Sequence, residues 1–197
     1  MAYTVELIKK EDQKTSCWSG GTTTQLAIYP PSSDYGKLNF KWRLSSAKVE
    51  VEESTFTNLP GIWRHIMVIN GELKLNHEGH HNINLKPLQK DSFSGDWTTK
   101  SYGKVTDFNL MLNKGCSGDI SPIILNKNCS FIVNSNLSTT EALYCVQGSM
   151  EIVINKDDKI TLNMGDLLLI NKEKEDIEIE LNSNNEDSIA IRGCINY

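Results

Sequence analysis

The chain has no excess of positive charge, no long hydrophobic run and no paired cysteines, and each absence excludes a class of protein. Its 197 residues carry 20 Lys and Arg against 25 Asp and Glu, a net charge of -5, which disfavours nucleic acid and anionic membranes as partners. No apolar run approaches the ~20 residues of a membrane-spanning helix. The five cysteines include no C-x-x-C pair, which indicates reduced thiols. The first ten residues lack a signal-peptide pattern, so we expect a cytoplasmic protein.

Long helical stripes are missing as well, because almost all hydrophobic periodicity in the chain is of period two. Short β-branched or aromatic segments are separated by Gly, Asn, Asp or Pro, which is typical of strands joined by tight turns. Many short strands with frequent turns predict an all-β sandwich or barrel. The predicted strands are Thr4–Ile8, Thr24–Tyr29, Phe40–Val51, Arg64–Asn70, Glu72–Asn76, His81–Leu85, Asp91–Phe93, Val105–Leu112, Cys129–Val133, Glu141–Gln147, Ser149–Ile154, Lys159–Leu162, Leu167–Ile170, Asp176–Leu181 and Ser188–Gly193.

One β-unit occurs twice in the chain. The segments Arg64–Leu75 and Glu141–Ile152 place a glycine, Gly71 or Gly148, at the same point, and each is followed by an Ile-x-Leu strand. An internal repeat of this kind predicts a duplicated architecture. In the second copy the glycine, the hairpin, a Gly-Asp turn and an apolar strand resemble the second half of a cupin barrel. We therefore expect a bicupin, an all-β fold of two fused cupin-type barrels or jelly rolls.

The boundary between the two halves is marked by strand-breaking residues. Gly115, Gly118 and Pro122 interrupt the alternating pattern after Lys114. The sequence therefore predicts an N-terminal half over residues 1–115 and a C-terminal half over residues 116–197.

Histidine is too scarce and wrongly spaced for a cupin metal site. Such a site takes imidazoles and a carboxylate from neighbouring strands, and the spacing H-x-H followed by Glu does not occur. We interpret the turn that holds His77, His80 and His81 as a solvated hairpin tip, and His65 as a core or interface histidine. The sequence predicts no metal and no cofactor. It also predicts no catalytic residue, because it has no G-x-S-x-G motif and Cys145 lies within an apolar strand.

Polar and aromatic residues are instead mixed in four segments of the first half, namely residues 17–25, 40–47, 56–64, and 93–96 together with 106–111. Because side chains alternate across a strand, Arg43, Ser45 and Ala47 share one face and oppose an apolar face. The same alternation places Asp107, Asn109 and Met111 on one face of another strand.

Arg64 begins a strand that is apolar on both faces, which predicts a buried guanidinium. An isolated buried charge is too costly to persist, so Arg64 needs Asp107, Asp96 or the anion of a ligand as a partner. Arginine binds planar carboxylates through two parallel hydrogen bonds. Small polar residues and a tryptophan would complete a cavity for a small acid. The predicted ligand-binding residues are Arg64, Arg43, Ser45, Asp107, Asn109, Trp18, Thr22 and Thr23.

The residues alone leave a structural alternative open. Arg64 and Asp107 could form an ion pair of the core, with Trp18 and Trp42 as ordinary core residues, since structural ion pairs resemble sites. Gly20 and the glycine after it could form a turn rather than a ligand loop.

The same segments make the chain similar to the HutD/Ves family of bicupins. The resemblance extends in order over roughly residues 15 to 115, and Gln25 departs from it, since the family more often has an acidic residue there. The second half matches only the general cupin pattern. The motifs are W-x-G-G-x-T (Trp18 to Thr23), F-x-W-R-x-S-x-A (Phe40 to Ala47), F-x-x-x-P-G-x-x-R (Phe56 to Arg64), F-x-G-D (Phe93 to Asp96) and D-F-N-L-M (Asp107 to Met111).

This resemblance implies a role in binding an intermediate of histidine degradation, for which urocanate and N-formylglutamate have been proposed in the family, or a role in stress responses. It implies no established catalytic activity. The first hypothesis is therefore a non-catalytic cytosolic protein in which Arg64 clamps a small organic acid.

The second hypothesis is a metal-independent cupin enzyme, an isomerase or lyase acting on a small acid or sugar. It would use Asp107 or His65 as general base, and that base would have to line the same cavity as Arg64. A scaffold acting by protein contacts would instead have a filled barrel. The sequence leaves the oligomeric state open, a homodimer included.

Overall fold

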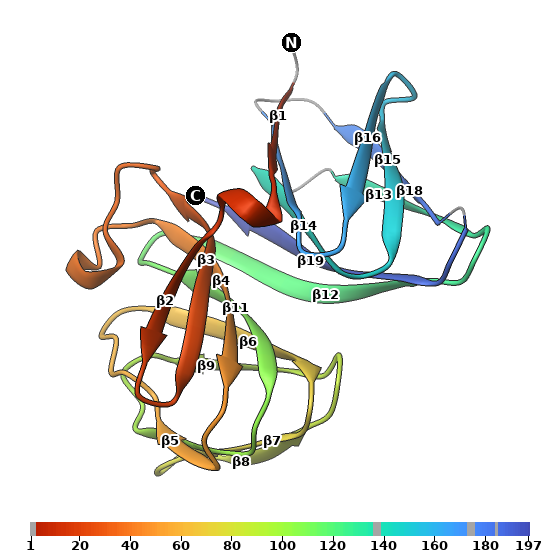
Figure 1. The fold of residues 1–197 in the computed structure, drawn as a ribbon. Helices are drawn as coiled ribbons and strands as arrows, with labels where there is room; N and C mark the ends of the chain where they lie inside the picture. Colours follow the sequence, from red (N-terminus) through yellow and green to blue (C-terminus); the bar gives the residue numbers. More distant parts are fainter. Residues whose placement is uncertain (1–2, 136–138, 173–175, 184) are drawn as a thin grey trace. The chain divides into compact units, whose positions relative to one another are not determined.

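The computed structural model describes residues 3–135, 139–172, 176–183 and 185–197, and Figure 1 shows that these residues form strands and two short 3₁₀ helices. No helix in this part of the chain is long and apolar enough to span a bilayer. The 3₁₀ helices are η1 (Lys10–Asp12) and η2 (Tyr35–Lys37). The strands are β1 (Tyr3–Ile8), β2 (Lys14–Trp18), β3 (Gly21–Tyr29), β4 (Trp42–Val49), β5 (Glu53–Thr55), β6 (Trp63–Asn70), β7 (Leu73–His77), β8 (Asn82–Leu85), β9 (Lys90–Ser94), β10 (Thr99–Tyr102), β11 (Thr106–Leu112), β12 (Ser117–Leu125), β13 (Ser130–Ser135), β14 (Thr140–Gln147), β15 (Ser149–Ile154), β16 (Asp158–Asn163), β17 (Leu167–Lys172), β18 (Ile177–Asn182) and β19 (Ser188–Asn196).

The prediction of an all-β fold is confirmed, and each predicted strand overlaps an observed one. The pattern misses β2, whose residues are all exposed, and the short polar strands β5 and β10. It also misses β12, because Gly118 and Pro122 lie inside that strand rather than between strands. β12 is the last strand of its sheet, and an edge strand tolerates a proline because its outward N–H has no ladder partner.

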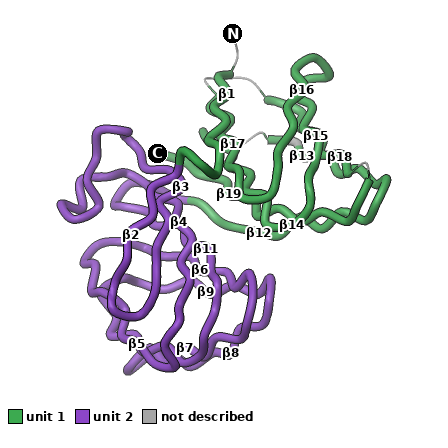
Figure 2. The backbone as a smooth tube through the Cα atoms, in the orientation of Figure 1, with its two compact units in different colours: residues 1–12, 118–197 green, residues 13–117 purple. Residues whose placement is uncertain are grey.

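The chain divides into two compact units, coloured separately in Figure 2: residues 13–117, and residues 118–197 together with 1–12. The sequence places residues 1–115 in one half, and the structure differs at the first twelve residues. β1 pairs antiparallel with β17, with Val5 opposite Ile170. The side chains of Val5 and Leu7 pack against the core of the unit that contains residues 118–197, which is why β1 belongs to that unit.

The unit of residues 13–117 consists of a six-stranded sheet in the order β2-β3-β4-β11-β6-β9 and a four-stranded sheet in the order β5-β10-β7-β8. Its core contains apolar side chains from both sheets, among them Ile66 and Val68 of β6 and Leu73 and Leu75 of β7. By the alternation of side chains along β6, Arg64 points to the same side as Ile66 and Val68. The fold therefore directs the guanidinium into the interior of this unit.

The other unit repeats this plan with a five-stranded sheet, β1-β17-β14-β19-β12, and a four-stranded sheet, β13-β18-β15-β16. Gly71 lies between β6 and β7, and Gly148 lies between β14 and β15, so both glycines occur where the chain leaves the larger sheet for the smaller. Their φ angles are 88° and 69°. A Cβ atom would lie 2.5 Å from the Lys104 carbonyl oxygen at Gly71 and 2.7 Å from the Asp187 carbonyl oxygen at Gly148. Both positions of the repeat therefore require glycine.

Candidate functional site

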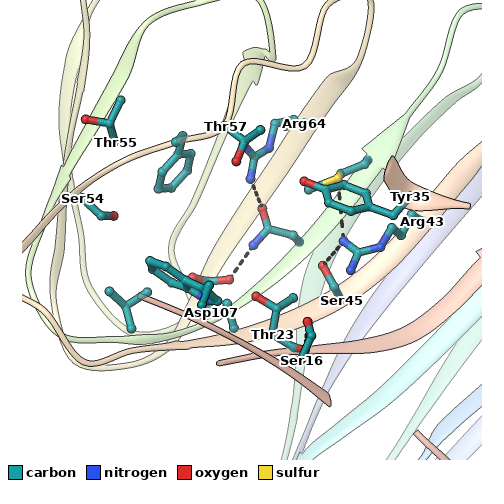
Figure 3. A pocket seen from close by; sticks show the side chains of 16 residues that line it. Ser16, Thr23, Tyr35, Arg43, Ser45, Ser54, Thr55, Thr57, Arg64 and Asp107 are labelled. Carbon is teal, nitrogen blue, oxygen red and sulfur yellow. Dashed lines mark hydrogen bonds between the residues drawn. The ribbon is translucent and has the colours of Figure 1, made fainter. Parts of the chain in front are cut away.

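A cavity of about 310 Å³ lies within the unit of residues 13–117, and Figure 3 shows its side chains. The strands β3, β4, β6 and β11 of the six-stranded sheet supply most of its polar wall, and the segment 54–57 closes the opposite side. β2 and η2 complete the lining. The lining residues are Ser16, Trp18, Thr23, Tyr35, Arg43, Ser45, Ala47, Val49, Ser54, Thr55, Phe56, Thr57, Arg64, Asp107, Asn109 and Met111.

Strand register brings the two arginines of the cavity together. Met111 of β11 is paired with Arg43 of β4 on one side and with Arg64 of β6 on the other. Asn109 is paired in the same way with Ser45 of β4. Because these residues are two apart on their strands, they all point to the cavity side of the sheet.

Arg64 is one of the three buried charged groups of the cavity wall. Its side chain is 7% exposed, and its guanidinium carbon lies 4.7 Å from the ring centre of Phe56 and 5.2 Å from that of Phe93. One nitrogen, Nη2, donates to Asn109 Oδ1 at 3.0 Å, while the buried Nε has no hydrogen-bond partner. Burial lowers the pKa of Arg64 to about 10, so the group stays charged at neutral pH.

Asp107 lies behind Asn109 and is 3% exposed. Asn109 Nδ2 donates to Asp107 Oδ1 at 2.5 Å, so the asparagine links the carboxyl group of Asp107 to the guanidinium of Arg64 (Figure 3). Burial raises the pKa of Asp107 to about 7, because the loss of hydration outweighs the attraction of Arg64 and the hydrogen bond from Asn109. This carboxyl group therefore changes its charge near neutral pH.

Neither of the two carboxylates that the sequence suggests as partners forms a salt bridge with Arg64. Asn109 stands between Arg64 and Asp107. Asp96 instead accepts hydrogen bonds from the backbone N–H of Gly61 and the hydroxyl of Ser94, in a turn outside the cavity. Among the described residues, no carboxylate lies within salt-bridge distance of the Arg64 guanidinium.

Arg43 is the second buried arginine of the wall, at 5% exposure. Its Nε donates to Gln25 Oε1 at 3.0 Å, its Nη1 donates to Ser45 Oγ at 3.0 Å, and its guanidinium carbon lies 4.3 Å from the ring centre of Tyr35. Burial lowers the pKa of Arg43. The hydrogen-bond partners of Arg43 among the described residues are the neutral side chains of Gln25, Ser45 and Met111, so dipoles solvate its charge.

The predicted site residues come together with one exception. Arg64, Arg43, Ser45, Asp107, Asn109, Trp18 and Thr23 all line the cavity. Thr22 does not, because it is adjacent to Thr23 on β3 and alternates to the other side of the sheet.

The tryptophans and glycines of the structural alternative lie partly in the cavity wall and partly outside it. Trp18 is 39% exposed and lines the cavity, whereas Trp42 is 2% exposed and belongs to the core. Ser19 and Gly20 form the turn between β2 and β3, and Gly21 is the first residue of β3, paired opposite Trp18.

Several lining residues are not predicted from the sequence. Met111 and Ala47 could have been included, because each lies two residues from a predicted site residue on the same strand. Phe56 and Thr57 belong to a motif of the sequence but lie in the irregular segment that directly follows β5. Tyr35 comes from η2, where the local pattern gives no signal for its position.

Among the histidines, the burial of His65 agrees with its interpretation and that of His77 does not. His65 is 6% exposed, contacts Ser92 Oγ through Nδ1 at 2.8 Å, and does not line the cavity. The interpretation of the 77–81 turn as a solvated tip holds for the exposed His80 and is wrong for His77, which is 2% exposed. Its ring packs at 4.5 Å, centre to centre, from that of Phe93.

Known proteins match this architecture along almost its whole length. The HutD family model matches residues 10–191. The structure of PA5104 from Pseudomonas aeruginosa PAO1, a conserved protein of unknown function, has a TM-score of 0.86 at 21% identity and covers 98% of this chain and 100% of that one. HutD from Pseudomonas fluorescens SBW25 has a TM-score of 0.70 at 22% identity, with the same coverage. A mutant of the oxalate decarboxylase OxdC from Bacillus subtilis has a TM-score of 0.73 at 6% identity and covers 95% of this chain and 76% of that one. At these identities the structures show a shared bicupin fold, and the family match shows that the chain belongs to the HutD family.

Proposed function

We propose that this protein binds a small carboxylate in the cavity beside Arg64 and does so without catalysis. The single observation that carries the proposal is the state of the Arg64 guanidinium. It is buried, it keeps its charge at neutral pH, and its Nε has no partner. A charge in such surroundings is strongly stabilised by an anion with two oxygen atoms in one plane.

The net positive charge of the cavity wall favours the binding of an anion. The lining contains two guanidiniums, Arg43 and Arg64, and one carboxyl group, Asp107, whose pKa of about 7 leaves it partly protonated at neutral pH. The cavity is therefore positive whether or not Asp107 is ionised. Its volume of about 310 Å³ lies at the small end of ligand pockets, which measure about 300–1,000 Å³. A small metabolite fits these limits better than a polymer or a large cofactor.

The family narrows the choice of acid. HutD proteins are linked by name to histidine utilisation, and urocanate and N-formylglutamate are acids of that degradation. Urocanate carries one carboxylate on a planar body, and N-formylglutamate carries two carboxylates that could engage Arg64 and Arg43. We propose a regulatory or stress-related role for this binding, in the cytoplasm, with the number of subunits open.

A screen of acids by thermal shift and titration calorimetry tests the proposal. The probes are formate, which is named as the condition of the Pseudomonas fluorescens HutD structure, acetate, urocanate and N-formylglutamate, each beside its uncharged methyl ester. We expect at least one acid to raise the melting temperature, since a ligand at a hundred times its Kd adds about 2.7 kcal/mol of stability. Equal shifts by acid and ester, or no shift with any acid, would contradict it.

Binding of a simple carboxylate should tighten as the pH falls from about 8 to about 6, because Asp107 takes up a proton in this range while the ligand, with a pKa near 4, stays ionised. The gain is at most about tenfold in affinity per pH unit. The Asp107→Asn variant should bind acetate with little pH dependence. Asp96 is exposed and lies outside the cavity, so Asp96→Asn is the matched control. Its acetate affinity should change with pH as steeply as that of the wild type. If calorimetry finds the same pH dependence of acetate affinity in Asp107→Asn and in the wild type, Asp107 is not the group that causes it.

One observation favours the enzyme as a second candidate function. Asp107 lines the same cavity as Arg64, and its raised pKa of about 7 suits a general base. His65 does not share the cavity and drops out of this role. Conversion of a bound acid by purified protein, lost in Asp107→Asn, would favour a metal-independent isomerase or lyase over a binding protein.

A further inference from the structure

A second group of functional side chains lies away from the carboxylate cavity, on the β7–β8 hairpin and the neighbouring strand β9. His77 Nε2 is 2.9 Å from Asp91 Oδ2, and His81 Nε2 is 3.1 and 3.2 Å from the two Asp91 oxygens. One donor atom from each of the three side chains lies within 4.8 Å of the other two. None of the three residues lines the cavity beside Arg64.

The contacts of His77 prepare one of its nitrogens for a cation. Thr99 Oγ1 donates to the carbonyl oxygen of Trp97 at 3.4 Å and lies 2.8 Å from His77 Nδ1. In the tautomer with the proton on Nδ1, His77 donates a hydrogen bond to Thr99 Oγ1 and presents the lone pair of Nε2 to the carboxylate of Asp91. A cation between these two acceptors satisfies both, and a hydrogen bond on the far nitrogen is the usual support of a metal-bound histidine.

The surroundings enclose the cluster on one side and leave it open on the other. The side chain of His77 has no exposed surface, Asp91 is 10% exposed and His81 is 39% exposed. The ring of Phe93 covers His77 at 4.5 Å between centres, and that of Trp97 stands edge-on at 5.6 Å. The exposed side of His81 leaves room for a water molecule as a further ligand.

We propose that His77, His81 and Asp91 bind one divalent transition-metal cation, with Zn²⁺ as the preferred ion. Two imidazole nitrogens and one carboxylate oxygen are the donor set of a borderline cation and a poor set for Mg²⁺ or Ca²⁺. Three protein ligands and one water complete the four-coordinate geometry that zinc favours.

The cation would have a structural consequence within this unit. β7 and β8 belong to the four-stranded sheet and β9 belongs to the six-stranded sheet, so the ion joins the two sheets at the hairpin. Removing it should therefore loosen the β7–β8 hairpin without changing the charges beside Arg64.

Titration of the chelator-treated full chain with ZnCl₂ in a calorimeter tests the site, and titration with Co²⁺ gives a visible spectrum that reports its geometry. We expect one cation per chain, a rise in melting temperature, and the absorption of four-coordinate Co²⁺. His81→Ala and Asp91→Asn should lower the affinity for Zn²⁺ at least about tenfold. His81 is partly exposed, so its replacement leaves the core intact, which a circular dichroism spectrum checks.

His80→Ala is the matched control. His80 lies on the same hairpin, is exposed, stacks on Trp97 at 3.7 Å and stands outside the cluster, so its loss should not weaken zinc binding. The proposal is overturned if the wild type binds no stoichiometric Zn²⁺, or if His81→Ala binds as tightly as the wild type. It is also overturned if His80→Ala loses as much affinity as His81→Ala, or if sulfur-to-cobalt charge transfer assigns the ion to the exposed thiols of Cys17 and Cys129.

Discussion

Replacing Arg64 by methionine is expected to abolish carboxylate binding while leaving the ligand-free protein at least as stable as the wild type. The loss of a buried, hydrogen-bonded charge that meets an anion costs about 2–5 kcal/mol of binding free energy, which is roughly a thirty- to several-thousand-fold increase in Kd. Calorimetric titration with the acid that binds the wild type most tightly measures this loss. Unfolding of both proteins in urea without ligand measures the stability.

The expected stability follows from what surrounds the guanidinium. Arg64 is buried with one hydrogen bond from Nη2, an unpartnered Nε and no salt bridge among the described residues. A methionine keeps most of the contact with Phe56 and Phe93 and removes a charge that is costly to bury. If Arg64 were instead half of a structural ion pair with Asp107, its removal would lower the free energy of unfolding by about 3–5 kcal/mol. The two interpretations that the sequence left open therefore predict opposite signs.

Arg192→Met is the control for this experiment, since Arg192 is a paired arginine of the other unit. Its Nε and Nη2 each donate to Glu141 at 2.7 Å, and the side chain of Glu141 is 1% exposed. Removing Arg192 takes two charge-assisted hydrogen bonds away from a buried carboxylate, so the protein should lose about 3–5 kcal/mol of stability and still bind the acid. If Arg64→Met is destabilised like Arg192→Met and still binds the acid, Arg64 is structural and the carboxylate proposal fails.

The faces of the site strands follow from sequence alone. Side-chain alternation has a period of two, so Arg43 and Ser45 on one strand, and Asp107 and Asn109 on another, must each share a side. The position of Arg64 within an apolar strand is likewise enough to predict its burial, which the structure gives as 7% exposure. These are local properties, and the structure agrees with them.

What the sequence does not supply is the partner of each buried group, because that depends on register between strands. Asn109 is paired with Ile66, two residues along the strand from Arg64, and its amide reaches both the guanidinium and Asp107. The sequence predicts Asn109 as a site residue, but it does not predict that this asparagine stands between Arg64 and Asp107. The sequence does not predict the cluster of His77, His81 and Asp91 for the same reason. His77 is buried by Phe93, a residue of another sheet.

The sequence assigns β1 to a different unit from the one observed, again because the assignment depends on pairing between strands. The pattern of β1 correctly predicts a strand, but the alternation of Val5 and Leu7 would suit the core of either unit. Pairing with β17 decides the matter, and that pairing joins segments from opposite ends of the chain. Nearness in sequence therefore favours the wrong unit for these twelve residues.

Phe93→Ala is expected to lower the free energy of unfolding by about 3–5 kcal/mol, as for other fully buried phenylalanines. Phe93 is 1% exposed in the core of residues 13–117, and its ring contacts Phe56, His77 and the guanidinium of Arg64 at centre distances of 5.9, 4.5 and 5.2 Å. The cavity left by alanine would remove support from the carboxylate site and from His77 together.

Urea unfolding of a graded series measures this effect. Phe93→Leu keeps most of the volume and should lose no more than about 1.5 kcal/mol, while Phe131→Ala, at a position that is 47% exposed, should change stability by less than about 0.5 kcal/mol. Because Phe93 touches both sites, Phe93→Ala should also weaken the binding of acid and of Zn²⁺. Arg64→Met should weaken only the binding of acid. A Phe93→Ala protein as stable as Phe131→Ala would show that this ring does not hold the two sites in place.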